Sequence, residues 1–187
     1  MINRFGEYLI EIVSDSSFNA ESTDNINAYD IVHNDTSEFH PSTKYGVRVT
    51  KGEQKIADAI IYGHGGATGI HENSFTIEQD LLLICCGDDV YALKLPSLTI
   101  HWKKKLDWAT CFAIYRFQEG FVIHGEIEIT KIDIAGNIAW KFSGKDIFVT
   151  SDGRESLKLA GDRIEATDWT GTTYLLSDKG TLIATSS

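Results

Sequence analysis

Apolar and polar positions alternate in short runs along most of the chain, and turn residues separate the runs. Short runs rich in β-branched and aromatic side chains are typical of β-strands. No segment of a dozen residues holds apolar positions at helical spacing behind a capping residue. The pattern therefore predicts an all-β fold. The strands expected after residue 73 are Ser74–Glu78, Leu81–Cys86, Val90–Leu95, Thr99–Lys103, Cys111–Phe117, Phe121–Gly125, Ile127–Ile132, Asn137–Phe142, Ser156–Leu159, Arg163–Thr167, Thr172–Leu176 and Thr181–Thr185.

These strands repeat in groups of four. A shift of 38 residues superimposes the first group on the second, and a further shift of 44 superimposes the second on the third. Propeller blades have four strands and a period of about 40–45 residues. The matched pairs are Gly87 and Gly125, Ile100 and Ile138, and Trp102 and Trp140 at the first step, then Ile132 and Leu176, Gly136 and Gly180, and Ile138 and Leu182 at the second. Residues 74–187 are therefore predicted to form three antiparallel β-meander modules.

The first 73 residues repeat less clearly. Strands are predicted at Glu7–Val13, Lys44–Thr50 and Gln54–Tyr62, which together make a degenerate N-terminal unit. Residues 14–42 between them are polar, and loops of this length are usually either disordered or functional. We expect a single domain over residues 1–187, with N-terminal strands and a polar loop in 1–73 followed by the three modules.

The end of the second module, Asp133-Ile134-Ala135-Gly136-Asn137-Ile138-Ala139-Trp140, resembles the blade repeat of quinoprotein-type β-propellers. In that repeat an Asp, a turn Gly and a Trp close the outer strand, and Asp133, Gly136 and Trp140 stand at these positions. The turn here is one residue shorter and has no Thr before the Gly.

The other two modules keep less of this repeat. The first has Trp102 but Leu95-Pro96-Ser97 at the turn, and the third has Gly180 but Ala184 in place of Trp. The resemblance covers residues 74–187 and implies a propeller-like fold. It implies no quinone cofactor, because the quinone-binding enzymes of that superfamily have many more blades. The repeat also occurs in dehydrogenases, assembly scaffolds and adaptors, so it does not define a function.

Charge narrows the class of partner. The chain has 27 acidic and 17 basic side chains, a formal net charge of −10. Nucleic-acid binding needs clustered Lys and Arg, so this balance argues against it. Acidic proteins associate faster with a partner of opposite charge. The composition therefore favours a protein partner with a basic face.

Location is predicted from three features. No apolar run approaches the roughly 20 residues that cross a bilayer, so no membrane contact is expected. Residues 1–7 lack the basic and apolar segments of a signal peptide. Cys85, Cys86 and Cys111 are odd in number and have no zinc spacing, which predicts buried thiols and no metal site. A cytoplasmic protein is the expectation.

The first candidate for a ligand site is the glycine-rich segment Gly63–Gly69. Its glycines, Gly65 and Gly66 among them, would let a ligand approach the backbone, with His64 and His71 as polar partners. The segment lacks the Lys-Ser/Thr ending of a P-loop, and no Gly-x-Ser-x-Gly elbow occurs in the chain. A flexible connector between the N-terminal unit and the modules is the other reading.

A second candidate comes from the repeat register. Cys86, His124 and Asp168 each fall at the end of the second strand of a module. Equivalent positions form a ring in a radial fold, so these groups could converge on a metal ion or form a nucleophile, a base and an orienting carboxylate. The alternative is that strand ends favour polar or small residues and that His124 is a satisfied interior histidine.

Two of the four tryptophans differ from the rest. Trp108 and Trp169 lie in predicted loops, where an exposed indole would anchor a protein partner.

Two main functions remain, beside a weaker third in which the chain supports a larger assembly and an unpaired outer strand adds to a neighbour's sheet. The first is a non-catalytic protein-interaction module, for example an immunity-type or adaptor protein. The second is a small-ligand-binding or hydrolytic domain that uses Gly63–Gly69 with His64 and His71, together with His124. No catalytic residue and no cofactor are assigned.

Overall fold

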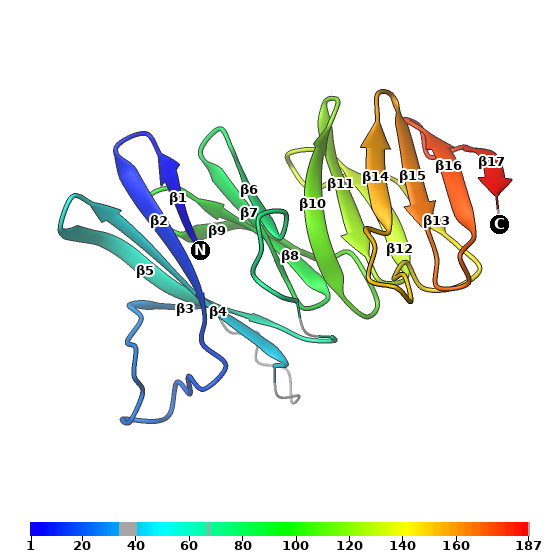
Figure 1. Ribbon diagram of the computed structural model, residues 1–187. Helices are drawn as coiled ribbons and strands as arrows, with labels where there is room; N and C mark the ends of the chain where they lie inside the picture. The colour runs from blue at the N-terminus through cyan, green and yellow to red at the C-terminus, as the bar shows by residue number, and fades with distance from the viewer. Residues whose placement is uncertain (34–40, 67, 187) are drawn as a thin grey trace.

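The computed structural model describes residues 1–33, 41–66 and 68–186, and the statements below concern these residues. Their regular structure is entirely β, in four sheets that follow one another along the chain (Figure 1). We call these sheets blades 1 to 4. No helix in the described part of the chain is long and apolar enough to span a membrane.

Blades 2 to 4 are four-stranded antiparallel meanders whose strand order follows the sequence. This confirms the three predicted modules, and each predicted strand agrees with an observed one to within one or two residues. Blade 2 contains β6 (Phe75–Glu78), β7 (Leu81–Cys86), β8 (Asp89–Lys94) and β9 (Thr99–Lys105). Blade 3 contains β10 (Cys111–Phe117), β11 (Gly120–Gly125), β12 (Glu128–Ile132) and β13 (Ile138–Ser143). Blade 4 contains β14 (Leu157–Ala160), β15 (Arg163–Thr167), β16 (Thr173–Ser177) and β17 (Leu182–Ser186).

Blade 1 is the predicted degenerate unit with additions. Its strands are β1 (Ile2–Phe5), β2 (Tyr8–Ser14), β4 (Thr43–Lys51) and β5 (Gln54–Gly63), and β3 (Ile31–His33) pairs in parallel with β5. The polar segment between β2 and β4 therefore supplies an outer fifth strand. The sequence pattern did not predict β1 or β3.

Part of the polar segment covers the outer face of blade 1. Phe18 is buried there beside Tyr29, and both rings pack on Ile60 and Tyr62 of β5. The Tyr29 hydroxyl donates to Asp15 at 2.8 Å, which ties the two ends of this covering segment together. Within the predicted 14–42 loop, Asp15, Phe18 and Tyr29 are therefore anchored on blade 1, while most side chains of residues 19–28 are exposed; residues 34–40 lie outside the described part of the chain.

Neighbouring blades bury apolar side chains between them. Blades 1 and 2 share a cluster that includes Ile12, Val47, Ile84 and Leu93. Similar clusters join blade 2 to blade 3 and blade 3 to blade 4. The three cysteines are free thiols buried in these layers, as predicted.

A tryptophan on the outer strand of one blade docks on the next blade. The Trp102 ring lies 3.0 Å from where a Cβ on Gly136 would stand, and the Trp140 ring lies 2.5 Å from the same point on Gly180. Each indole N–H donates to the carbonyl two residues before that glycine, at 3.0 and 2.9 Å. Both glycines have φ near +75°, so glycine is required for the turn and for the ring contact.

Each blade has two distinct ends. The first and third hairpins of the blades lie at one end, which we call the turn end. The second hairpins and the connections between blades lie at the other, the linker end, which faces downward in Figure 1. The linker end comprises residues 15–30, 64–74, 87–88, 106–110, 126–127, 144–156 and 168–172. His64, Gly65, Gly66, His71, Trp108, Trp169 and Asp168 lie in these segments, and His124 and Cys86 lie next to them, in the last two residues of β11 and β7.

Candidate functional site

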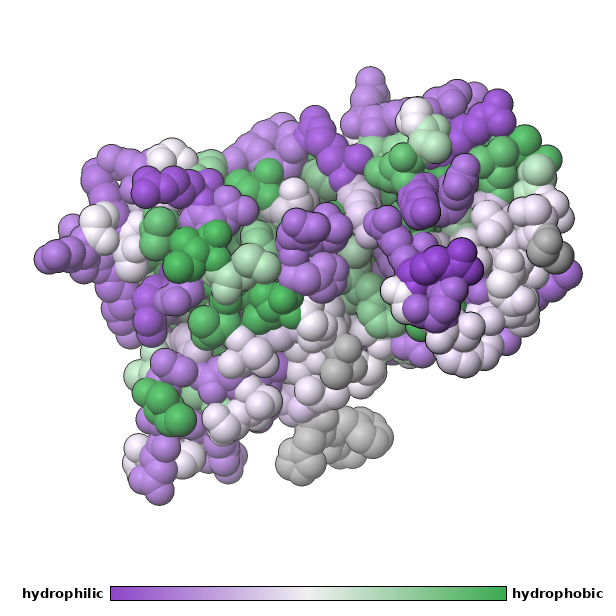
Figure 2. Space-filling view, viewed as in Figure 1, coloured by the Kyte–Doolittle hydropathy of each residue, from purple (hydrophilic) through white to green (hydrophobic). Residues whose placement is uncertain are grey.

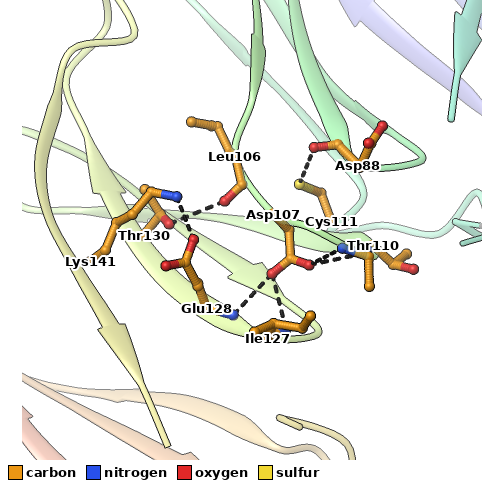
Figure 3. A network of polar contacts seen from close by, with 10 residues as sticks. Asp88, Leu106, Asp107, Thr110, Cys111, Ile127, Glu128, Thr130 and Lys141 are labelled. Carbon is orange, nitrogen blue, oxygen red and sulfur yellow. Dashed lines mark hydrogen bonds and ion pairs between the residues drawn. The ribbon is translucent and has the colours of Figure 1, made fainter. Parts of the chain in front are cut away.

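A buried carboxylate holds the linker end together between blades 2 and 3. Asp107 is 1% exposed, and its Oδ1 accepts from the backbone N–H groups of Ala109 and Thr110 at 2.7 and 3.1 Å. Its Oδ2 accepts from the N–H groups of Ile127 and Glu128 at 3.0 and 2.9 Å (Figure 3). One side chain therefore fixes the 106–110 loop and joins it to the second hairpin of blade 3.

Weaker polar contacts surround this carboxylate. The Thr130 hydroxyl donates to the Leu106 carbonyl at 3.3 Å, and the Cys111 thiol donates to the Asp88 carbonyl at 3.4 Å (Figure 3). All of these contacts cross from one blade or linker to another. The loop that follows Asp107 is consequently part of a rigid junction.

Asp168 has the same role within blade 4. It is fully buried, and its carboxylate accepts from Thr170, Thr172 and the Tyr174 hydroxyl at 2.6–3.1 Å. Burial raises the pKa of Asp168, but the hydrogen bonds from Thr170, Tyr174 and Thr172 outweigh that effect and lower it below its ordinary value. The 168–172 hairpin is therefore held closed by an ionised side chain.

An exposed indole follows each of these two aspartates. Trp108 is 71% exposed and Trp169 is 50% exposed, as the sequence analysis expects for these loops. The Lys105 ammonium lies 5.0 Å from the centre of the Trp108 ring and 2.7 Å from Asp88 Oδ2. A cation–π contact thus restrains the Trp108 ring against its own blade.

The linker end is strongly acidic. Its segments hold twelve carboxylates: Asp15, Glu21, Asp24, Asp30, Glu72, Asp88, Asp107, Glu126, Asp146, Asp152, Glu155 and Asp168. The same segments hold two Lys or Arg side chains, Lys145 and Arg154. Arg154 Nε donates to Asp152 at 2.5 Å, which leaves little uncompensated positive charge here. Figure 2 shows hydrophilic residues around small groups of hydrophobic ones on one face of the molecule.

The glycine-rich segment lies against the second hairpin of blade 2 and the 106–110 loop. The Gly66 N–H donates to the Ala109 carbonyl at 2.8 Å, and the His64 carbonyl accepts from Asp88 at 2.8 Å. A side chain at Gly65 or Gly66 would overlap atoms of residues 109–110. The glycines therefore allow close approach of the protein's own backbone, and ligand binding at His64, Gly65 and Gly66 stays a prediction.

His71 and His124 share a groove of about 310 Å³ between blades 3 and 4, and His64 does not line it. Phe112, Tyr115 and Phe148 provide aromatic lining, and residues 153–156 form one wall. The structure thus brings together two of the three predicted histidines. His71 is exposed at the rim, with its Nε2 3.1 Å from the Phe112 carbonyl oxygen.

The ring of His124 donates a hydrogen bond to the protein's own backbone. Its Nε2 lies 2.9 Å from the Phe148 carbonyl oxygen and 3.0 Å from Ser156 Oγ. Because a carbonyl oxygen only accepts, Nε2 carries the proton and is not available as a base toward Ser156. The Ser156 hydroxyl also donates to Phe148, at 2.9 Å. Burial lowers the pKa of His124, which favours the neutral ring.

The three register-equivalent residues do not converge. Cys86 directs its thiol at the carbonyls of Thr43 and Ile61, at 3.9 and 4.0 Å, and no hydrogen bond joins it to His124 or Asp168. Each of the three bonds within its own blade interface or hairpin. No group of three or more His, Cys, Asp or Glu in the described residues is placed to hold a metal ion.

Sequence reasoning did not find Asp107, Ser156 or Glu155. A pattern was present for the first, because Asp-Trp occurs twice, at 107–108 and 168–169, and both times in a predicted loop. Ser156 meets His124 across 32 positions of sequence, and no local pattern indicates that contact.

Comparison with known proteins defines the fold class. No family model and no curated protein matches the sequence. The crystal structure of BamB from Moraxella catarrhalis, a quinoprotein-like β-propeller, superimposes with a TM-score of 0.52 and 13% identity over 100% of this chain and 47% of that chain. The Neurospora crassa Pan2 WD40 domain gives a TM-score of 0.45 and 10% identity over 61% of this chain and 37% of that one.

The likeness to BamB confirms the predicted resemblance to propeller blades. This chain is an all-β, repeated, propeller-like protein, and it spans about half the length of the BamB chain.

Proposed function

We propose that this chain is a non-catalytic protein-interaction module, of the adaptor or immunity type, that binds a basic face of a protein partner through its linker end. The observation that carries the proposal is that both exposed indoles directly follow a buried aspartate that fixes their loop. Association is weakened by the cost of ordering loops and side chains. Loops that are already fixed avoid most of that cost, and Trp is enriched among residues that dominate binding energy.

The charge of this end supports the choice of partner. Trp108 and Trp169 lie at the end whose segments hold twelve carboxylates and two basic side chains. Four of these carboxylates are buried, and Asp30 is paired with Lys55, so the exposed and unpaired ones carry the charge that a partner would meet. A like-charged partner would be repelled, and a basic one would be drawn in at a rate that depends on salt. The propeller-like fold is compatible with this role but does not establish it.

The test is an affinity capture from the native lysate with tagged protein, compared with a Trp108→Ala/Trp169→Ala double variant. We expect one stoichiometric protein partner that the double variant loses, with the variant's free energy of unfolding within about 0.5 kcal/mol of wild type. The partner should elute at raised salt.

The matched control is Ile100→Ala/Ile138→Ala. These side chains are 40% and 46% exposed at equivalent positions of β9 and β13, away from the linker end. This variant should keep the partner. Retention of the partner by the tryptophan variant, or its loss from the isoleucine control, would remove the linker end from the interaction.

A second candidate function is small-ligand binding in the His71–His124 groove. It is favoured by the groove itself, which has an apolar lining and two histidines at its polar points. Hydrolysis is the less supported form, because His124 Nε2 donates to a carbonyl. Ligand and metal screening by thermal shift, with wild type beside His64→Ala and His71→Ala, tests this reading.

A further inference from the structure

The groove between blades 3 and 4 has an aromatic floor. Phe112, Ala113 and Tyr115 of β10 line it on one side, and Phe148 and Val149 line it on the other. Its volume of about 310 Å³ is large enough for one or two long side chains but small for a folded element. Flat aromatic faces with an open entrance are suited to an extended aliphatic stem.

The polar groups of the floor are already engaged. Ser156 and His124 Nε2 both donate to the Phe148 carbonyl, at 2.9 Å in each case. Arg154 also lines the groove, but its Nε is paired with Asp152 at 2.5 Å. The one Lys or Arg side chain among the described residues that line this groove is therefore already paired through its Nε.

The rim carries negative charge instead. Glu155 lines the groove, and its Oε1 accepts from the Tyr115 hydroxyl at 3.5 Å. Burial, then the Glu155 carboxylate and more weakly Glu72, raise the pKa of Tyr115 to about 12. Carboxylates beside an aromatic face favour a cation placed over the ring.

We propose that this groove receives a lysine or arginine side chain of the protein partner, with the stem on Phe112 and Tyr115 and the charged head at Glu155. The inference rests on the proposed function, because it supplies a specific contact for a basic partner. The groove is continuous with the neighbouring surface: residues Thr150, Arg154, Glu155 and Ser156 also line a second hollow of about 420 Å³ that includes Trp169. A partner held by Trp169 is therefore in reach of the groove.

The test uses small probes on the whole chain and does not need the partner. N-acetyl-lysine methylamide and its arginine counterpart are titrated into ¹⁵N-labelled protein at low ionic strength, beside the norleucine and glutamate analogues. We expect backbone amide shifts confined to residues 112–115 and 148–156 with both basic probes, and affinity on the order of millimolar. The norleucine and glutamate probes should cause no saturable shift there.

Two variants locate the cation. Glu155→Gln should weaken the lysine probe about fivefold, because it removes the exposed charge nearest the ring. Glu119→Gln, an exposed acid at the turn end, should leave the affinity unchanged. The amide spectrum of each variant reports whether the fold is intact.

Equal weakening by both variants, or shifts spread over all the acidic loops, would show general charge attraction and overturn the proposal. Tighter binding of the norleucine analogue would assign the groove to an apolar ligand and overturn it as well. Neither result bears on whether the tryptophan variant loses the captured partner. The proposal for the groove and the proposed function can therefore fail separately.

Discussion

The two ends of the blades hold the same molecule together by different means. At the turn end the contact is repeated: an indole from one blade lies on a turn glycine of the next, at Trp102 with Gly136 and at Trp140 with Gly180. At the linker end the contacts differ from junction to junction, and a single carboxylate such as Asp107 replaces the ring.

This difference distinguishes contacts that recur between successive blades from contacts that occur at one junction only. The repeated contact recurs at two successive junctions, from blade 2 to blade 3 and from blade 3 to blade 4. Loops that vary while a rigid scaffold holds them are where binding residues are usually found. The exposed indoles, the histidine groove and the excess of carboxylates all lie at the varied end.

Among the changes that test this comparison, Asp107→Ala is expected to lower the free energy of unfolding most. The change leaves four backbone N–H groups without their acceptor, and each such group costs about 1–3 kcal/mol where it stays away from water. We expect the free energy of unfolding, measured by urea denaturation, to fall by about 3–5 kcal/mol. Asp146 is an exposed carboxylate of the same end, and Asp146→Ala is the control. Its free energy of unfolding should fall by less than about 0.5 kcal/mol. A loss under about 1 kcal/mol at position 107 would mean that the linker end is held together by other contacts.

A smaller effect is expected at the turn end from Gly180→Ala. The new Cβ meets the left-handed backbone penalty and stands 2.5 Å from the Trp140 ring. Gly161→Ala is the matched control, because Gly161 also has a positive φ, +64°, but has nothing within 4 Å. We expect losses of about 2–3 kcal/mol at position 180 and about 1 kcal/mol at position 161. Equal losses would show that the indole moves aside freely and that the docking contact contributes little.

The smallest effect is a pH dependence at the groove. The pKa of His124 is lowered in the folded chain, so the unfolded chain binds more protons between that pKa and the ordinary value of about 6.5. Stability conferred by the neutral ring is present above about pH 6.5 and falls as the pH is lowered through this window, by at most about 1.4 kcal/mol per pH unit. Urea denaturation at several pH values from 7.5 to 5 is the measurement, with His124→Gln as the reference. A variant whose stability has the same pH slope as wild type would contradict a buried, neutral His124.

Much of the fold could be predicted from the chain. Alternating apolar positions and glycine turns located the strands of blades 2 to 4, because each hairpin is a local structure that its own residues specify. The strand β3 could not be located in this way. Ile31–His33 is extended because it pairs with β5 and because His33 Nε2 meets the Leu98 carbonyl at 2.8 Å, across 65 positions of sequence.

The candidate site was predictable in part for the same reason. The loops of Trp108 and Trp169 were evident as breaks between strands. The glycines at 65 and 66 predicted close approach of a ligand to the backbone, whereas the structure places residues 109–110 of the chain itself against them. The groove was not evident, because Ser156 of the linker after blade 3 is far in sequence from Phe112 and His124, which lie on the paired strands β10 and β11. The position of the 144–156 linker against blade 3 brings these residues together.

The tryptophan contact also has a direction. The indole always belongs to the earlier blade and the turn glycine to the later one, so the contact is head-to-tail and has no two-fold partner. Blade 2 supplies a ring and blade 4 receives one. Among the described blades only blade 3 does both, with Gly136 receiving and Trp140 supplying. Blade 3 is therefore complementary to a copy of itself in this contact, and it is the unit that a tandem duplication could insert without changing either neighbour.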